Sequence, residues 1–192
     1  MRQKAAPVMM FVGDSFTVGS GPVPTWGSYA SETARRLGWQ PVIAGAAGTG
    51  YVNRGRVGRD FREAFEAELS WRPAPDLLVV SGGHNDRRWS VLKVRRAAAA
   101  LLWLVRARWP QTQVVVVGPM WMGDPPRGAW PVRDALAEVA GREGLPFLDP
   151  MRQSWAKGEA RGLVLPDGVH PTFTGHKVIA RWLATQLTVL TK

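Results

Sequence analysis

Ser15 is the hydroxyl-bearing residue of this sequence that is best placed to act as a nucleophile. Five apolar residues, Val8 to Val12, end abruptly at Gly13-Asp14-Ser15. Such a run is short enough for a buried strand that leads into a turn, and open α/β sheets bind their ligands at this carboxyl end of the strands. The same pattern suits a serine that only caps the next helix, so Ser15 needs support from elsewhere in the chain.

A carboxylate and an imidazole stand three residues apart near the other end of the chain. Asp167 and His170 lie in a loop-like stretch just ahead of an apolar-periodic segment. A serine hydroxyl becomes nucleophilic near neutral pH when a histidine takes its proton and an aspartate orients that histidine. His84 and His176 lack a carboxylate three residues before them, so we expect both to be structural or to support the reacting groups from behind. No serine lies in G-x-S-x-G, which disfavours the nucleophile-elbow hydrolases.

Two further segments place glycines and polar residues after predicted strands. The loop from Gly45 to Gly50 follows strand 41–44, and Gly83-His84-Asn85-Asp86 follows strand 76–81. The first loop lets a ligand approach the backbone closely, but G-x-G-x-x-G does not fit in it, which disfavours dinucleotide binding. The second loop would suit a plain turn, yet it leaves the sheet at the same edge as Ser15.

These four segments together resemble the four sequence blocks of the SGNH (GDSL-type) hydrolases. The order and spacing fit, and the resemblance spans nearly the whole chain. It implies a serine esterase or lipase that needs no cofactor, with Ser15 as nucleophile, His170 as general base and then acid, and Asp167 as the orienting carboxylate. It also implies an oxyanion hole made of the backbone N–H groups of Ser15 and Gly48 and the side-chain amide of Asn85.

The second block departs from the family pattern. Ile43 stands where many members carry asparagine, two residues before the first glycine. The choice among Gly45, Gly48 and Gly50 as oxyanion donor is therefore open, and we predict Gly48.

Other residues near these blocks have expected supporting roles. We expect Asp14 to brace loops by hydrogen bonds rather than to transfer protons. Phe16 replaces the leucine that is commoner in the first block and changes the bulk at the mouth of the site. Trp121 and Met122 lie in a loop after strand 113–117, where they form either a plug at the edge of the core or a wall of the acyl pocket.

Strands and helices alternate along the sequence. We predict strands 8–12, 41–44, 76–81, 113–117 and 146–148, helices 26–37, 57–71, 90–109, 131–143 and 172–190, and a segment 151–165 that is irregular or briefly helical. Alternation of this kind implies βαβ units and a parallel sheet with helices on both faces. The expected fold is a flavodoxin-like three-layer α/β/α sandwich with five strands, in one domain spanning residues 1–192.

The composition narrows the possible partners. The formal net charge is +10, but the arginines are spread along the chain without a long basic tract. This distribution favours a solvated surface over a specific nucleic-acid site. It is compatible with long-range attraction for an anionic ester substrate or an anionic surface. With no cysteine and only three histidines, we expect no disulfide, no metal and no cofactor.

The sequence gives two signals about membranes and compartment. Arg2 and Lys4 before an apolar run resemble a secretory signal, but cleavage there would delete the first strand, so we interpret the run as structure and expect a cytoplasmic protein. A signal removed ahead of Met1 would instead make the protein a secreted one. The apolar run from Ala97 to Val105 is only nine residues long, whereas a spanning helix needs about 20.

Two other functions are compatible with the same residues. An O-acyltransferase would use the same triad and pass the acyl group to another alcohol. A non-catalytic module would bind a nucleotide or nucleic acid on the sheet through its basic surface, with salt-sensitive affinity and an unreactive Ser15.

Overall fold

The computed structural model describes residues 5–153, 155 and 162–190. Five strands form a parallel sheet in the order β2-β1-β3-β4-β5, with bounds β1 Val8–Gly13, β2 Gln40–Gly45, β3 Leu77–Ser81, β4 Gln113–Val117 and β5 Phe147–Leu148. This is the flavodoxin-like strand order, in which the chain reverses direction across the sheet between β1 and β3. The predicted fold class is confirmed.

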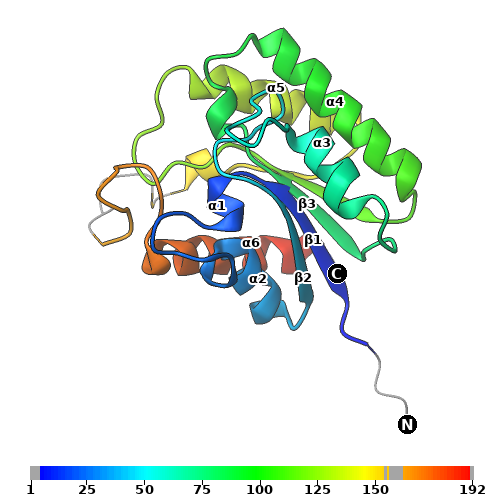
Figure 1. The fold of residues 1–192 in the computed structure, drawn as a ribbon, viewed down its shortest axis with the longest axis horizontal. Coiled ribbons are helices and arrows are strands. Elements are labelled where there is room, and N and C mark those ends of the chain that lie inside the picture. Colours follow the sequence, from blue (N-terminus) through cyan, green and yellow to red (C-terminus); the bar gives the residue numbers. More distant parts are fainter. Residues whose placement is uncertain (1–4, 154, 156–161, 191–192) are drawn as a thin grey trace.

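Helices cover both faces of the sheet (Figure 1). One face carries α2 (Tyr29–Leu37) and α6 (Phe173–Leu190), and the other carries α3 (Phe61–Ala64), α4 (Val91–Arg108) and α5 (Ala129–Arg142). The short helix α1 (Ser15–Val18) continues directly from the carboxyl end of β1. No helix in the described part of the chain combines the length and apolar character needed to cross a membrane.

The central strands are buried on both sides, as their continuous apolar sequences predict. In β1, Met10 and Val12 pack into the core beneath α4 and α5, whereas Met9 and Phe11 pack into the core beneath α2 and α6. The predicted first strand is therefore a central strand, with β2 on one side and β3 on the other. Residues 1–4, which contain the basic positions before it, lie outside the described residues.

Two predicted helices begin later than the apolar pattern indicated. The helix expected from residue 26 is a 3-10 turn at Thr25–Gly27 followed by α2, because the Ser28 side chain accepts the Ser31 N–H and starts the helix there. The helix expected from residue 57 begins at Phe61, where Asp60 and Glu63 form a capping box. It ends in a π-helical turn at Phe65–Leu69.

One helix begins earlier than predicted. Pro131 was expected to open α5, which instead starts at Ala129. Proline is tolerated there because the N–H groups of the first helical turn have no acceptor within the helix. The segment predicted as irregular or briefly helical begins with a 3-10 turn at Pro150–Arg152. Part of this segment, residues 154 and 156–161, lies outside the described residues.

Candidate active site

Ser15 stands at the carboxyl end of β1, at the first position of α1. Asp14 caps this helix, since its Oδ1 accepts the Phe16 N–H at 3.0 Å. A side chain at Gly13 would overlap Thr17, so the strand must end in glycine for the chain to turn this tightly. The turn carries the Ser15 hydroxyl to the edge of the sheet where ligands of this fold class bind.

A chain of hydrogen bonds joins Ser15 to the far end of the sequence. Ser15 Oγ lies 2.9 Å from His170 Nε2, and His170 Nδ1 lies 2.7 Å from Asp167 Oδ2. The other oxygen of Asp167 accepts the N–H groups of Val169 and His170, each at 2.9 Å. The structure thus brings together the three residues that the sequence nominated for acyl transfer.

The ionisation of Asp167 fixes the tautomer of His170. Burial would raise the pKa of this carboxyl, but the hydrogen bonds from the His170 ring and from the two backbone N–H groups outweigh it and lower the pKa to about 2. An ionised carboxylate only accepts, so the imidazole proton lies on Nδ1 and Nε2 keeps its lone pair. Nε2 is then free to accept the Ser15 proton.

The loop that carries His170 is fixed to its own neighbourhood. Val164 and Pro171 form an isolated β-bridge, and the Leu165 N–H donates to the His170 carbonyl at 2.7 Å. Gly168 takes a left-handed conformation, with φ of 71°, which glycine adopts without steric cost. Asp167 and His170 are therefore held in a closed turn.

The glycine-rich loop contains an N–H group, that of Gly48, that is available to a ligand. Gly45 packs against the Gly13 backbone so closely that a side chain there would overlap it. Gly50 donates its N–H to the Asn53 carbonyl at 2.8 Å. For Gly48, with φ of 77°, no acceptor for its N–H is found among the described residues. Gly48 is thus the glycine whose N–H remains available.

Asn85 lies beside this loop, as the sequence predicted. Its Nδ2 donates one hydrogen bond to the Thr49 carbonyl at 2.9 Å. A side-chain amide has two N–H donors, so the bond to Thr49 positions the group and leaves a second donor.

Asp86 is the residue whose role the sequence did not reveal. Its fully buried carboxylate accepts three backbone N–H groups of the residues that directly follow the glycine-rich loop. They belong to Tyr51 at 2.8 Å, Val52 at 3.0 Å and Asn53 at 2.9 Å. Burial raises its pKa, and these hydrogen bonds oppose that rise. Gly50 must be glycine because a side chain would overlap this carboxylate. Asp86 thus binds the loop after β3 to the loop after β2.

Asn53 completes this connection. Its side-chain amide donates to the Gly48 carbonyl, and its Oδ1 accepts the Trp89 indole N–H at 3.1 Å. Asn53 lies in a segment without periodicity, so nothing in the sequence singled it out. The only sequence signal for a contact between the loops after β2 and β3 is that Asn85 and Asp86, two adjacent polar residues, follow a predicted strand.

Asp14 is buried next to the nucleophile and does not contact His170. Removal from solvent raises its pKa from 3.8 to about 7, partly offset by the Phe16 N–H, and the charge of Asp86 adds to the rise. Its hydrogen bond to Phe16 caps α1, and the bracing of loops expected from the sequence stays a prediction.

The burial of Asp14 makes the stability of the protein depend on pH. Its folded-state pKa of about 7 exceeds the unfolded value of 3.8, so the folded state binds the proton more tightly. The contribution of Asp14 to the free energy of unfolding is then fully present below about pH 4. It is lost, by up to about 4 kcal/mol, as the pH rises through 7. We expect Asp14→Asn to flatten this decline in urea unfolding at several pH values. Asp124→Asn, at an exposed position, is the control and should keep the wild-type slope; an unchanged slope in Asp14→Asn would contradict the assignment.

Two other histidines are held in structural positions. His84 Nδ1 donates to the Met120 carbonyl at 3.0 Å, and His176 Nδ1 accepts the Tyr29 N–H at 3.0 Å. Burial lowers the pKa of each ring to about 4, so both are neutral at pH 7. Neither forms a hydrogen bond with Ser15, and a structural or supporting role stays the prediction for both.

The residues suggested for the acyl pocket are largely buried. The Phe16 ring lies between the rings of His84 and His170, with centroid distances of 5.4 and 5.6 Å. Trp121 stacks on His84 at 4.0 Å. Met122 packs in the core with Phe16 and is 1% exposed. Trp121 and Met122 therefore have the positions of a plug at the edge of the core. Phe16 contacts the rings of His84 and His170, and Trp121 contacts that of His84.

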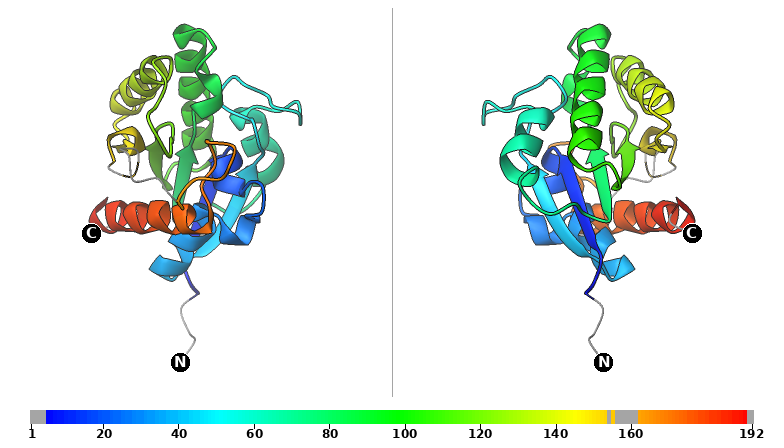
Figure 2. Two further views of the ribbon diagram at one scale, coloured as in Figure 1. Left: turned by 90° about the vertical axis from the view of Figure 1, so that its left-hand side faces the viewer. Right: turned by 90° about the vertical axis from the view of Figure 1, so that its right-hand side faces the viewer.

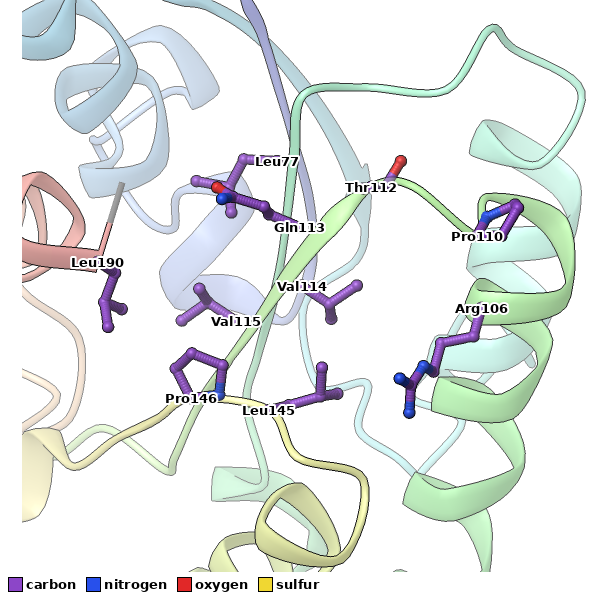
Figure 3. A pocket seen from close by; sticks show the side chains of 10 residues that line it. All are labelled: Leu77, Arg106, Pro110, Thr112, Gln113, Val114, Val115, Leu145, Pro146 and Leu190. Carbon is purple, nitrogen blue, oxygen red and sulfur yellow. The ribbon is translucent and has the colours of Figure 1, made fainter. Parts of the chain in front are cut away.

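A cavity of about 270 Å³ lies elsewhere, at the amino ends of β3 and β4 (Figure 3). It exists because β5 pairs only with Val116 and Val117 and leaves the start of β4 without a neighbouring strand. Apolar side chains from both faces of the sheet line it, together with Arg106. The cavity is at the opposite end of the strands from Ser15.

In the described part of the chain, no three acidic or histidine side chains gather to form a metal site.

Fold and sequence together define a hydrolase that acts on ester bonds and is built on a flavodoxin-like sandwich. The chain belongs to the GDSL-like lipase/acylhydrolase family, whose sequence model matches residues 11–178. It is 29% identical, over 188 residues, to a GDSL lipase of Mycobacterium tuberculosis; the match covers 90% of this chain and 78% of that protein.

Solved structures share the fold. A family two carbohydrate esterase from Clostridium thermocellum, in complex with cellohexaose, superposes with a TM-score of 0.76 at 21% identity, over 100% of this chain and 67% of that one. The lipase/acylhydrolase from Enterococcus faecalis superposes with a TM-score of 0.76 at 16% identity, over 94% and 95% of the two chains.

Proposed function

We propose that this chain is a serine esterase that cleaves small carboxylic or thioesters through an acyl-enzyme on Ser15. The observation that carries the proposal is the continuous hydrogen-bond chain from Ser15 Oγ through the His170 ring to Asp167. Ser15 Oγ attacks the ester carbonyl while Nε2 takes its proton, and the imidazolium then donates that proton to the leaving alcohol or thiol. Water, deprotonated by the same nitrogen, releases the carboxylic acid and restores the Ser15 hydroxyl.

The oxyanion of both tetrahedral intermediates needs preorganised donors. We assign this role to the backbone N–H groups of Ser15 and Gly48 and to the second N–H of the Asn85 amide. Each such donor typically lowers the barrier by about 2.7–4 kcal/mol. The Asp86 carboxylate positions the glycine-rich loop and is a positioning residue rather than a catalytic one.

Water, rather than a second alcohol, is the acceptor that the exposure of the site favours. The side chains of His170 and Asp167 are 26% and 47% exposed, so solvent reaches the base that must activate the acceptor. A transferase has to keep water from its acyl-enzyme. This exposure supports hydrolysis over the acyl transfer that the sequence left open.

Labelling of Ser15 by a fluorophosphonate tests the proposal. We expect one adduct per chain, located at Ser15 by peptide mass analysis, with loss of hydrolysis of a chain-length series of p-nitrophenyl esters. His170 should make this hydroxyl alone strongly nucleophilic. Ser15→Ala should show neither labelling nor turnover, and Ser20→Ala, at a nearby serine, should show both. An adduct elsewhere, or none, would favour a non-catalytic binding module.

A further inference from the structure

Four large aromatic side chains are exposed at one edge of the sandwich. They are 66%, 40%, 40% and 38% exposed, and we call them the aromatic rim: Trp26, Trp89, Trp130 and Phe173. Each stands within three residues of the start of a helix, namely α2, α4, α5 or α6. In a parallel α/β sheet every such helix starts at the carboxyl edge of the strands, which is also the edge that carries Ser15.

Contacts tie the rim to the site. Trp26 and Phe173 lie 5.9 Å apart between ring centroids, and Phe173 is three residues from His170. The Trp89 indole N–H donates to Asn53, three residues after the glycine-rich loop. The left view of Figure 2 faces this side of the molecule, from which α1 and the segment before α6 project. The aromatic rim therefore lies at the edge of the sheet that carries Ser15, and three of its four residues contact or border segments next to the site.

Arginines accompany these aromatics. The loops after β2, β3 and β4 contain six arginines, of which Arg54 and Arg59 pair with Glu63 and Glu68. We call the other four the rim arginines: Arg56, Arg87, Arg88 and Arg127. None of these four forms an ion pair with a carboxylate of the described residues, whereas many arginines on the helices do. Asp124 is an exposed acidic residue in the same loops, so the rim carries an excess of positive charge.

We propose that the rim is a docking surface for an anionic lipid–water interface. Tryptophan and phenylalanine suit the boundary between headgroups and acyl chains because their rings are large and, in tryptophan, carry one polar group. Cationic side chains next to them are attracted by anionic headgroups. A surface that joins both signals binds lipid more firmly than either signal alone, and the net charge of +10 adds long-range attraction.

Docking by the rim would point Ser15 at the interface. The orientation has value only if the proposed esterase function holds, because an ester presented by the lipid phase would then meet the nucleophile directly. Binding itself does not need catalysis. It can therefore be measured in Ser15→Ala protein, where failure to bind and failure to hydrolyse are separate results.

The test is sedimentation of the Ser15→Ala chain with phosphatidylcholine vesicles, with and without phosphatidylglycerol. We expect binding to the anionic vesicles that weakens when the ionic strength is raised from about 0.1 M to about 1 M, which shortens the Debye length from about 10 to about 3 Å. Adding Arg88→Gln and Arg127→Gln should weaken it by about 30-fold. Adding Trp26→Ala and Trp130→Ala should weaken it by at least about tenfold.

Matched controls lie away from the rim. Trp103 is 69% exposed on α4, twelve residues or about 18 Å from its start, and Arg181 is exposed eight residues into α6. We expect Trp103→Ala and Arg181→Gln to bind as the parent does. Thermal unfolding checks that every variant is folded, and the arginine pair, being surface-exposed, tests the proposal even if the tryptophan pair unfolds.

Three results would overturn the proposal. Equal sedimentation of the parent with neutral and anionic vesicles, or with neither, would exclude an anionic lipid partner. The controls could lose binding as strongly as the rim variants, which would assign the effect to overall charge. Finally, a DNA duplex that competes with the vesicles for the protein would identify a general polyanion site. In that case the arginine variants would weaken binding and the tryptophan variants would not.

Discussion

Replacing Asp167 by asparagine is expected to lower kcat by about 10⁴-fold. In the native chain Oδ1 of Asp167 accepts the Val169 and His170 N–H groups, and Oδ2 accepts the ring N–H of His170. An asparagine whose oxygen keeps the backbone bonds must turn its NH₂ group toward Nδ1. The imidazole would then carry its proton on Nε2, where it cannot accept the Ser15 proton.

The size of this effect distinguishes orientation from folding. Asp167 is 47% exposed in its side chain, so we expect the melting temperature to fall by little while kcat falls by orders of magnitude. The control is Asp124→Asn, an exposed carboxyl-to-amide change that should leave kcat at the wild-type level. Steady-state kinetics with one p-nitrophenyl ester and thermal unfolding of the same preparations give both quantities. A loss smaller than about tenfold would mean that another group orients His170.

The parallel sheet was predictable because its sequence signals are local. Continuous apolar runs such as Leu77 to Ser81 are typical of strands buried on both faces, and each ends where a glycine or polar residue begins. The alternation with helices then determines the topology. This topology is what allows two residues 155 positions apart, Ser15 and His170, to be expected at one edge, where the structure places them 2.9 Å apart.

Helix starts were less predictable because polar side chains, not apolar periodicity, determine them. Val57 fits the apolar spacing of the helix that follows, but Gly55 and Gly58 beside it take left-handed conformations that interrupt a helix. The capping box of Asp60 and Glu63 sets the start at Phe61 instead. The sequence carries this signal in Asp60 and Glu63, three residues apart.

The support beneath the proposed oxyanion hole could not be read from the sequence. The roles of Asp86 and Asn53 depend on how closely two loops approach, and these loops are more than thirty residues apart in the chain. Neither residue has a spacing that distinguishes it from a turn residue. Local sequence motifs therefore predict the reacting groups, whereas only tertiary contacts identify the residues that position them.

Asn85→Ala is expected to lower kcat by about 10²–10³-fold and to leave KM nearly unchanged. The Asn85 amide donates one N–H to the Thr49 carbonyl and has a second to give. If this second N–H binds the developing oxyanion, its contact strengthens mainly in the transition state, and its loss appears in kcat. Loss of the bond to Thr49 costs about 0.5–1.5 kcal/mol of stability at the same time.

That loss of stability needs its own control, because a loosened loop could also slow the reaction. Asn53→Ala removes side-chain bonds to Gly48 and Trp89 from the same loop without removing a proposed oxyanion donor. We expect it to lower the melting temperature at least as much as Asn85→Ala and to lower kcat far less. Equal losses of kcat in the two variants would assign the effect to the loop. Near-wild-type kcat in folded Asn85→Ala protein would remove Asn85 from the site.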